Sequence, residues 1–539
     1  MLSGLRFQTA TPAGPVSPDR TDIACFIGHV ARRPGTPLPA EVRDALRTAG
    51  WVGGPWDRGP AALDALQQIP VVVESFEIFH RLFAWERRPL GSTDSATCAT
   101  YLGAAVRSFF ADGGRRAVVI RVADPFPFLE SPGGRLSNRS ARLHGLVPAY
   151  SDVGIPALPF NPTDPRTWRG IEHLYGLPEV SHLCLPDLPD ICAADPQTPP
   201  TAFVPPPPPE TFVECSEDEP AAPADRGLRR LAAPRCDDTG FMAWSRAVRL
   251  VCAFLATNNP AGTRRGDALL VAALPLALPD ARHDEGIRTA HAQADLVGFL
   301  RAVGVLEGAN GSPAATGTAA SAFLQSVWPW LRTLRSDDLP QSVEPGDGVF
   351  AGLLARNALV RGTFRSVGGT ILDDVIGLTP LPAMGLGEDG PTDQLAQRVC
   401  VIAPEPDGNT VLSDVTTSPD VAWRFGGTSR LMAAILRSAR RFGESHAFEP
   451  NGPALWTRLR RSLEGMLDAF WREGAFGGAT ANDAYTVRCD RSTMNQNDLD
   501  SGRLIAEVSV LPAAAISRIT VVLDMTLGEA TRTEVREVA

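Results

Sequence analysis

The sequence predicts a multidomain protein in which an α/β domain is followed by a C-terminal α+β domain. Its 539 residues exceed what one hydrophobic core usually organises. The segment from Tyr101 to Val122 reads as a helix, a glycine turn and a β-branched strand, which is the pattern of an α/β layer. Two amphipathic segments, 430–441 and 455–471, precede the strand-like Ile505–Leu511, which favours a separate α+β unit near the end of the chain.

The overall composition argues against several classes of protein. A net charge of −10 and a pI near 5.4 disfavour a general nucleic-acid binder. No apolar run reaches the ~20 residues of a membrane-spanning helix, and the N-terminus lacks a basic region followed by an apolar one. The nine cysteines are scattered without a C-x-x-C pair, which favours reduced thiols in a cytoplasmic product.

The N-terminal part of the chain predicts an extended arm and then the first strands of the α/β domain. Residues 1–20 hold Leu5 and Phe7 among several prolines and read as an arm rather than a domain. Ile23–Val30 is a short apolar run ended by a turn, which predicts a buried strand. Val71–Val73 predicts another strand, with a short helix after it.

A helix is predicted over Tyr101–Phe110, since its apolar residues recur at helical spacing. Asp112-Gly113-Gly114 ends this helix, and Ala117–Val122 predicts the strand that follows. The two glycines do not form a phosphate-binding loop, because the Lys-Ser/Thr of that motif is absent.

Residues 125–235 are predicted to be irregular, apart from a strand at Val180–Leu185. The pentaproline Pro205–Pro209 favours a polyproline II spacer or a surface loop. Acidic residues follow it, namely Glu214, Glu217, Asp218 and Glu219. A role as an SH3 ligand is disfavoured because basic flanking residues are missing.

The next part of the chain predicts further alternation of helices and strands. Helical periodicity covers Ala243–Ala256 and Ala290–Val303, and Asp267–Leu274 predicts a strand. Arg265-Gly266-Asp267 is interpreted as the turn before that strand. Val401–Val415 predicts a hairpin around Pro406–Asn409.

Both amphipathic segments near the C-terminus carry arginines beside an apolar stripe. In the second segment, leucines at 455, 459, 463 and 467 form the stripe, with Asn451 as the expected N-cap and Gly474 just past the end. Two interpretations have equal weight, a solvated basic face and a face that meets an acidic partner surface. The arginines concerned are Arg430, Arg437, Arg440, Arg441, Arg458, Arg460 and Arg461.

The last segment, 516–539, contains a strand-like run from Ile519 to Leu527 and a charged tail. Its alternating apolar residues are Ile519, Val521, Leu523 and Met525. An unpaired strand of this kind is an aggregation hazard in a monomer, whereas it connects subunits in a polymer. The alternative is an ordinary last strand of its own sheet, a place that Ile505–Leu511 is expected to fill.

Catalytic and metal-binding interpretations find little support in the sequence. His182, Cys184 and Cys192 fit no standard zinc spacing, so we predict neither a metal nor another cofactor. His144-Gly145, Asp238-Thr239-Gly240 and Gly427-Thr428-Ser429 resemble the three words of a subtilase, but their order along the chain is wrong for one. Thr428 or Ser429 is better interpreted as a helix N-cap, and we predict no catalytic residues.

Several unusual segments recur in one fixed order, and together they resemble contractile tail sheath proteins of phage tails, pyocins and phage-like injection systems. Phe109–Gly114 with Val118–Val122 is one such segment, and Ala351–Arg356 with Arg361-Gly362 is another. The C-terminal series resembles the C-terminal domain of that family. It comprises Trp423-Arg424-Phe425, Phe448–Asn451, the glycine-rich turn 474–480, Val487–Met494, the run 495–500 and Gly502-Arg503-Leu504.

This resemblance implies a structural subunit rather than an enzyme. It implies a linking arm over 1–20, a subtilisin-like α/β middle domain over 21–375, a C-terminal sheath domain over 376–515 and a second linking arm over 516–539. Both arms would exchange strands with neighbouring copies. The subunits would form helically stacked hexameric rings around an inner tube and contract to drive the tube through a target membrane.

The implied partners are further copies of the chain, the inner tube protein and baseplate and cap proteins, with no direct contact to nucleic acid or membrane. Assembly would take place in the bacterial cytoplasm, as part of a phage tail or a phage-tail-like particle. Two alternatives stay open at this point. One is a subtilase-like hydrolase, and the other is a baseplate or adaptor component that does not polymerise.

Overall fold

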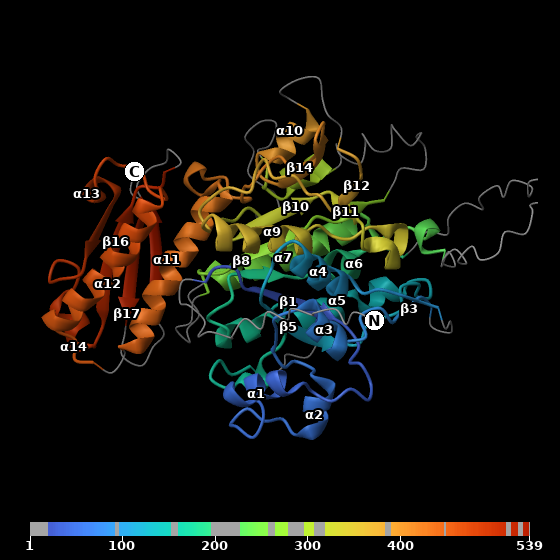
Figure 1. The fold of residues 1–539 in the computed structure, drawn as a ribbon, viewed down its shortest axis with the longest axis horizontal. Coiled ribbons are helices and arrows are strands. Elements are labelled where there is room, and N and C mark those ends of the chain that lie inside the picture. Colours follow the sequence, from blue (N-terminus) through green and yellow to red (C-terminus); the bar gives the residue numbers. More distant parts are fainter. Residues whose placement is uncertain are drawn as a thin grey trace, which may run out of the picture.

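The computed structural model describes eleven stretches of the chain. They are residues 20–91, 96–151, 160–195, 227–256, 265–278, 296–306, 319–382, 390–446, 449–513, 519–525 and 532–537, the last two as backbone alone. Figure 1 shows a larger α/β body and a smaller C-terminal domain beside it. The predicted arm residues Leu5 and Phe7 and the pentaproline lie outside the described residues.

An eight-stranded sheet forms the centre of the body, with six parallel strands flanked by an antiparallel strand at each edge. The spatial order is β14-β13-β10-β8-β6-β1-β5-β2, and the edge strands β14 and β2 are the antiparallel ones. The strands are β1 Ala24–His29, β2 Val71–Val73, β5 Ala117–Ala123, β6 His182–Cys184, β8 Leu269–Ala273, β10 Leu324–Trp328, β13 Cys400–Glu405 and β14 Gly408–Val411. Every residue of β1 is buried, as expected for a parallel strand with helices on both faces.

Helices cover both faces of this sheet and create two hydrophobic cores. One core joins the sheet to α5 Gly134–Leu146, α6 Leu188–Cys192, α7 Asp238–Ala256 and a helix over 296–302. The opposite core joins it to α1 Ala40–Thr48, α3 Phe76–Leu82, α4 Tyr101–Ala111 and α9 Asp347–Val360. Along β1, Cys25 and Ile27 belong to the first core, whereas Ala24 and Phe26 belong to the second. The coarse prediction of a mixed α/β multidomain fold is confirmed.

Small residues allow α4 and α9 to pack closely, as the Ala- and Gly-rich sequence of α9 suggests. A Cβ added at Gly348 would lie 2.5 Å from Cα of Ala105, and one at Gly352 would lie 2.7 Å from the carbonyl oxygen of Phe109. Two backbones therefore meet where side chains would otherwise separate them.

Helix α5 corrects the prediction that residues 125–235 are irregular. Its buried face holds Arg135 and Arg139 together with Leu143 and Leu146. Arg135 is compensated by an ion pair with Asp190 at 3.0 Å. Arginines therefore occupy inward positions where the sequence pattern looks for apolar residues, and the helical periodicity of hydrophobicity is lost.

The predicted boundary at residue 375 needs correction as well. Strand β13 runs parallel to β10 and continues the body's sheet, so the sheet extends through β14. The core of the C-terminal domain begins at Leu431. The sequence alone places the hairpin in the second domain, because it does not reveal that β13 pairs with a distant strand.

The C-terminal domain packs two long helices against a four-stranded antiparallel sheet. The helices are α11 Gly426–Ser445 and α12 Pro453–Arg472, and the sheet order is β15-β16-β17-β18. The strands are β15 Tyr485–Arg488, β16 Leu504–Val510, β17 Ile519–Met525 and β18 Arg532–Glu537, and the short helices are α13 Ala481–Ala484 and α14 Gln496–Asp500. Buried and half-buried residues alternate along β16, which is typical of a sheet covered on one face.

Two local predictions at helix N-termini are wrong. The N-cap of α12 is Gly452 and not Asn451. The side chain of Asn451 accepts a hydrogen bond from Nε1 of Trp456 and donates one to the carbonyl oxygen of Arg503. Thr428 and Ser429 lie inside α11, which begins after Phe425. Gly474, with φ of 82°, follows the end of α12 as predicted.

Candidate interaction site

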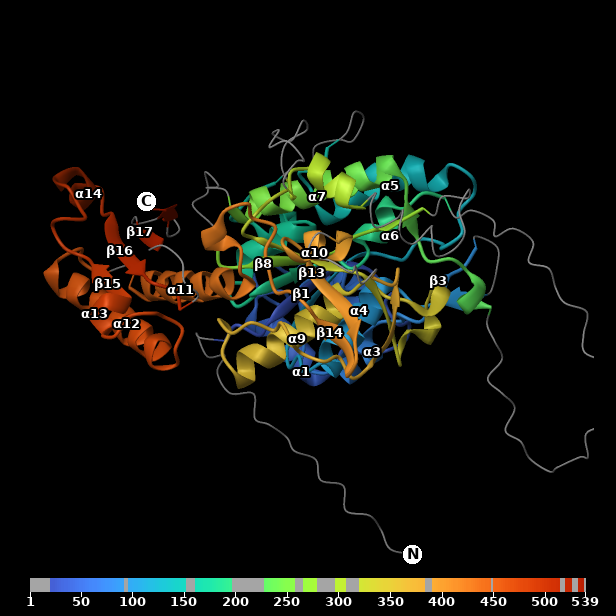
Figure 2. The same ribbon diagram turned by 90° about the horizontal axis from the view of Figure 1, so that it is seen from above.

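Helix α11 lies at the junction between the two parts of the molecule, as Figures 1 and 2 both show. Its apolar side chains Leu431, Ile435 and Ala439 belong to the core of the C-terminal domain. Arg430, Arg437 and Arg440 instead form ion pairs with aspartates of the body. Helix α11 therefore packs its apolar stripe into the core of the smaller domain and pairs its arginines with carboxylates of the larger one.

Arg430 binds Asp414 in a fully buried, bidentate pair. Its two terminal nitrogens donate to the two carboxylate oxygens at 2.8 and 2.7 Å. Gln325 and the backbone N–H of Val367 donate to the same carboxylate. Although burial opposes ionisation, these donors hold the pKa of Asp414 below its ordinary value, so the pair stays charged.

A second buried carboxylate, Asp267, faces three arginines. The distances from its side-chain oxygens are 3.0 Å to Nε of Arg265, 2.5 Å to Nη2 of Arg440 and 3.7 Å to Nε of Arg437. Burial disfavours the charged form, yet the three guanidinium groups lower the pKa of Asp267 to about 2. The Arg265-Gly266-Asp267 segment forms the turn that was predicted before β8.

These contacts correct part of the predicted arginine surface. Arg430 and Arg437 are buried and Arg440 is nearly so, and all three are engaged within the chain. In the single chain, their guanidinium groups point to carboxylates of the body and not to solvent. The helical spacing of α11 could not distinguish an exposed basic face from a face buried against a second domain.

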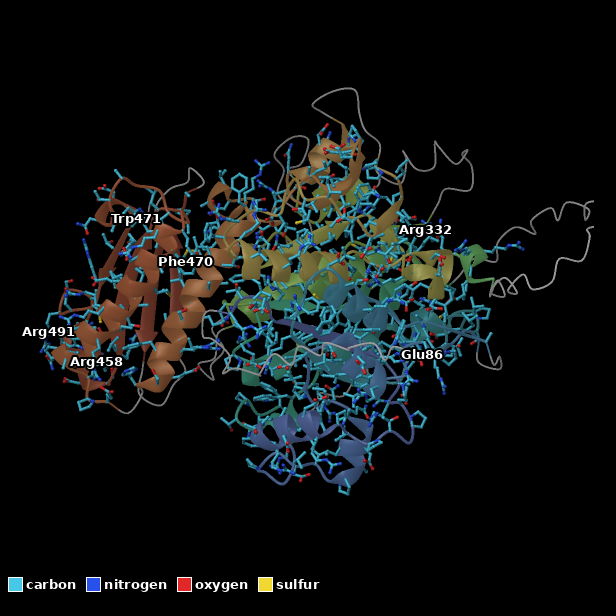
Figure 3. The ribbon with its side chains drawn as sticks, in the orientation of Figure 1. Glu86, Arg332, Arg458, Phe470, Trp471 and Arg491 are labelled. Carbon is cyan, nitrogen blue, oxygen red and sulfur yellow. The ribbon has the colours of Figure 1, made fainter. Side chains whose placement is uncertain are left out.

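The arginines of α12 do lie on the surface. Arg458, Arg460 and Arg461 are exposed, and Arg441 near the end of α11 is half-buried. Figure 3 shows Arg458 on the side of the C-terminal domain that faces away from the body. Arg458 pairs with Glu449 and Arg460 with Glu464, both at exposed positions where such pairs add little stability. These four residues keep the predicted role as a proposal.

The C-terminal sheet offers a second kind of interaction site, its backbone edge. Strand β17 pairs with β16 of the same chain in an antiparallel register that places Leu523 opposite Ala506 and Val521 opposite Val508. Strand β18, which the sequence analysis read only as a charged tail, follows as the outermost strand. The alternating charges of Arg532, Glu534 and Arg536 hid its strand character. In this single chain, the predicted arm therefore closes its own sheet.

At the carboxyl ends of β1 and β6, in the region where ligands bind in open α/β sheets, two buried aspartates bind groups of the protein itself. Asp187 accepts from the backbone N–H groups of His29 and Leu102 at 2.5 and 3.0 Å. Next to it, Asp190 pairs with Arg88 at 2.8 Å and with Arg135. Burial would raise the pKa of Asp190, but the two arginines hold it below its ordinary value. The sequence analysis missed this network because its members are far apart in the chain.

The structure does not bring the subtilase-like words together. His144 lies on α5, Asp238 begins α7 and Ser429 lies on α11. The hydroxyl of Ser429 is buried and has no hydrogen-bond partner, while Nδ1 of His144 contacts the carbonyl oxygen of Tyr150. Within the described residues, therefore, no base is bonded to this serine as acyl transfer requires.

His182 and Cys184 lie on β6 and Cys192 ends α6, all of them buried. Among the described residues, no three His, Cys, Asp or Glu side chains are grouped so that they could hold a metal ion. In the same part of the chain, no helix combines the length and the apolar character needed to cross a membrane. The eight described cysteines are all unpaired thiols.

No protein-family model and no curated protein matches the sequence. Solved structures do. A chain of the anti-feeding prophage baseplate in its contracted state, determined by cryo-EM, is 17% identical, covers 95% of this chain and 96% of its own, and superposes with a TM-score of 0.50. The two chains share a fold.

Two further matches have lower scores. The sheath complex of an extracellular contractile injection system, PVC, in its contracted state has a TM-score of 0.47 at 14% identity, covering 95% of this chain and 94% of that one. The sheath tail protein of Desulfitobacterium hafniense has a TM-score of 0.31 at 13% identity and covers 54% of this chain and 60% of its own.

Proposed function

We propose that this protein is the structural subunit of a contractile sheath. The observation that carries the proposal is a shared fold along nearly the whole of both chains with a component of a contracted prophage particle. The motifs that resemble sheath proteins support it independently, since they recur in order from Phe109 to Leu504. Many copies would polymerise in hexameric rings around an inner tube, and the sheath would be a mechanical element rather than an enzyme.

Strand exchange through the two ends of the chain would link the subunits. The ladder between β16 and β17 is made by backbone groups, so β17 can pair with β16 of a neighbouring copy as well as with its own. In the assembly, Ile519, Val521, Leu523 and Met525 would enter a neighbour's sheet, and Leu5 and Phe7 in the arm 1–20 would contribute a further strand. We place the body at 21–425, the sheath domain at 426–515, beginning with α11, and the second arm at 516–539.

Contraction would release free energy stored at assembly. On a signal from the baseplate, subunits would rotate outward as near-rigid bodies while the exchanged strands keep them connected. The exposed arginines 458, 460 and 461 and the half-buried Arg441 would face the tube or an adjoining subunit, where screened ion pairs are weak enough to break during the movement. This mechanism requires neither a nucleotide, a metal nor another cofactor.

The partners would be further copies of the chain, the inner tube protein, and baseplate and cap proteins, with no direct binding of nucleic acid or membrane. Assembly in the bacterial cytoplasm would produce a phage tail or a phage-tail-like particle. Neither alternative function gains a specific observation from the described residues.

Electron microscopy of the purified protein tests the proposal. We expect striated tubes from the full chain and none from a chain that ends at residue 515, which should instead remain a folded monomer by circular dichroism and sedimentation. A full chain that stays monomeric at every concentration tried would contradict a sheath and favour the adaptor alternative. Hydrolysis of a peptide or ester substrate that disappears in Ser429→Ala would favour the hydrolase.

A further inference from the structure

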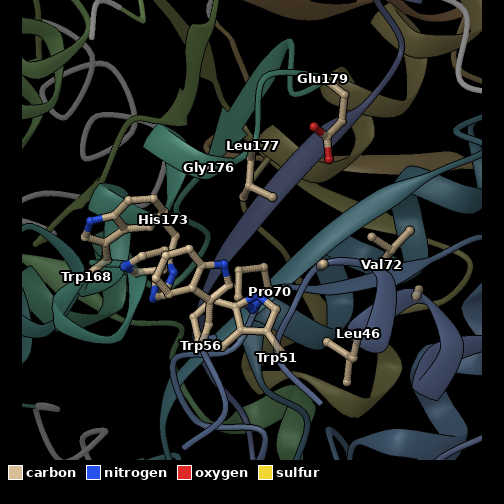
Figure 4. A pocket seen from close by; sticks show the side chains of 13 residues that line it. Leu46, Trp51, Trp56, Pro70, Val72, Trp168, His173, Gly176, Leu177 and Glu179 are labelled. Carbon is tan, nitrogen blue, oxygen red and sulfur yellow. The ribbon is translucent and has the colours of Figure 1, made fainter. Parts of the chain in front are cut away.

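A pocket of about 220 Å³ opens in the body, and none of the residues that line it belongs to the sites described above. Three of its lining residues are tryptophans, Trp51, Trp56 and Trp168, and Figure 4 shows their side chains close together at one end. Helix α1 and the segment 51–72 supply one part of the wall, and the segment 165–179 supplies the rest. We name this site the tryptophan pocket.

Two glycines allow indole rings of the tryptophan pocket to lie against the backbone. Gly50, with φ of 82°, lets Trp56 approach, since a Cβ there would lie 2.8 Å from the indole ring. Gly176 does the same for Trp168, where the corresponding distance is 2.6 Å. The positions of these two rings are therefore built into the fold.

The wall of the pocket has one formal charge, the carboxylate of the half-buried Glu179. Figure 4 shows Glu179 apart from the three tryptophans. No lysine or arginine is among the lining residues. A carboxylate where there is little water attracts a cation over several ångströms without touching it. The charge of the wall therefore favours a positively charged ligand over a negatively charged one.

The indole rings favour a cation as well, because the face of an aromatic ring attracts positive charge. One ring of the cluster already has such a contact, since the guanidinium carbon of Arg58 lies 5.3 Å from the ring centroid of Trp51. Nη2 of Arg58 donates to the carbonyl oxygens of Pro165 and Arg166 at 3.1 and 2.7 Å, which holds this side chain outside the pocket. The other two indole rings are not used by Arg58.

A buried histidine in the wall has no partner of its own among the described residues. His173 lies between Trp51 and Trp168, with ring centroids 6.1 and 6.2 Å away, and is fully buried. Burial, together with the charges of Arg58 and Arg169, lowers the pKa of His173 to about 3, so the imidazole is neutral and does not repel a cation. Neither ring nitrogen has a hydrogen-bond partner, which leaves one for a hydroxyl group of a ligand.

The volume of the pocket restricts the size of its occupant. It exceeds that of a cavity of about 150 Å³ that holds benzene, and it is below the ~300 Å³ at which pockets for drug-sized ligands begin. In proportion to benzene, a ligand of about seven to nine non-hydrogen atoms fits. Choline is a compound of this size, with a quaternary ammonium group and a hydroxyl.

We propose that the tryptophan pocket binds a small quaternary ammonium compound, with its methyl groups against the indole rings and its charge balanced by Glu179. Clusters of aromatic side chains are the usual binding sites for such groups. The occupant is a free compound of the size of choline, and the experiment separates it from a lipid headgroup of the same chemistry. This inference does not depend on the sheath proposal, because it rests on residues of the body alone.

The test is a calorimetric titration of choline into the purified full chain at fixed ionic strength. We expect saturable binding. The compound 3,3-dimethyl-1-butanol has the shape of choline with a neutral carbon in place of the charged nitrogen, and it should bind at least tenfold more weakly. This comparison separates attraction of the charge from simple filling of an apolar pocket.

Variants of the wall test the role of each group. Trp56→Ala should weaken choline binding at least tenfold and Glu179→Gln at least threefold. Arg58→Gln removes a neighbouring positive charge, so this variant should bind choline at least as tightly as the unchanged chain. Trp471→Ala, a half-buried tryptophan on α12, and Glu77→Gln, an exposed carboxylate on α3, are the matched controls and should leave the affinity unchanged.

Several outcomes would overturn the proposal. They are the absence of saturable choline binding, equal affinity for the neutral compound, and undiminished binding by Trp56→Ala or Glu179→Gln chains that are folded by circular dichroism. Choline binding without sedimentation of the chain on phosphatidylcholine vesicles supports a free ligand. Sedimentation on these vesicles that choline competes away would overturn the assignment to a free compound.

Discussion

Helix α11 is attached to the body at two buried aspartates, and the two attachment sites differ in their balance of charge. Asp414 faces a single guanidinium, that of Arg430, with neutral donors completing its hydrogen bonds. Asp267 faces Arg265, Arg437 and Arg440. The first site is neutral overall, whereas the second places three guanidinium groups around one buried carboxylate, with the exposed Glu444 pairing with Arg440 at its edge.

The difference shows in the arginines themselves. Burial lowers the pKa of Arg437 to about 10. The neighbouring arginines lower this pKa further, whereas Asp267 raises it. A buried cation whose pKa falls this far has lost more in hydration than its partner returns. We therefore expect the start of α11 to be fixed firmly at Asp414 and its second half to be held at Asp267 at an electrostatic cost.

The largest expected effect comes from breaking the balanced site. Asp414→Ala leaves Arg430 buried without a counter-charge, which should destabilise the protein by about 3–5 kcal/mol. Chemical unfolding followed by circular dichroism measures this loss. Asp44→Ala removes an exposed ion pair with Arg47 and is the control, with an expected change within about 0.5 kcal/mol. A loss at Asp414 as small as the control's would mean that water reaches this pair.

A dependence on pH should set the junction apart from the body. The lowered pKa of Asp267, about 2, is below its value in the unfolded chain, so its contribution is present above about pH 4 and is lost as pH falls through 2. Inside the body, burial raises the pKa of Asp112 and of Asp347 to about 7. Folding therefore favours their protonated forms, and stability should fall as pH rises from about 4 through 7.

Unfolding measured between pH 3 and 8 should thus show a maximum on the acidic side of neutrality. Since each of the two pKa values rises from about 4 to about 7, up to about 4 kcal/mol should be lost by pH 8 for each of the two carboxyl groups. Asp347→Asn should remove part of the alkaline loss and leave the acidic limb unchanged. An unchanged alkaline limb in both Asp347→Asn and Asp112→Asn would show that these carboxyl groups are ionised in the folded protein at neutral pH.

A smaller effect is expected at the unbalanced site. Arg437→Met keeps most of the side-chain volume and removes one of three cations. The protein loses hydrogen bonds from Arg437 to backbone carbonyls, but it no longer buries that charge. The two effects nearly offset each other, so the variant should cost about 1 kcal/mol of stability. Arg430→Met is the matched comparison and should cost about 3–5 kcal/mol, because it leaves Asp414 unpaired. Equal losses in the two variants would refute the contrast between the sites.

The sequence predicted those elements whose residues have one kind of environment along their whole length. Strand Ala117–Ala123 is apolar except for Arg121 and is buried up to its last residue, and α12 has one apolar stripe facing one core, so both are predicted within a few residues. Helix α5 was missed because paired arginines replace apolar residues on its inner face. Strand β18 was missed because alternating charges mark an exposed edge.

The candidate site was predicted only in part, for a related reason. The arginines of α11 and α12 look alike in the sequence, yet only those of α12 are exposed. This difference depends on Asp267 and Asp414, the partners of the α11 arginines. Asp267 lies far from α11 in the sequence, and Asp414 lies in the loop that precedes the helix. The sequence pattern of a helix shows which residues lie on one face. Ion pairs with a second domain then decide whether that face is buried or remains exposed to a partner.

The smallest effect on stability, and the most direct test of the remaining arginine surface, is expected at Arg461. This residue is exposed on α12, so Arg461→Glu should change the free energy of unfolding by less than about 0.5 kcal/mol. If α12 faces an acidic tube or neighbour, the same variant should form fewer tubes, and the defect should grow as ionic strength is lowered, because less salt strengthens the new repulsion. Arg43→Glu, an exposed arginine on α1, is the control, and normal tubes are expected from it. Normal tubes from Arg461→Glu at low salt would place the tube-facing surface elsewhere and leave α12 with a solvated basic face.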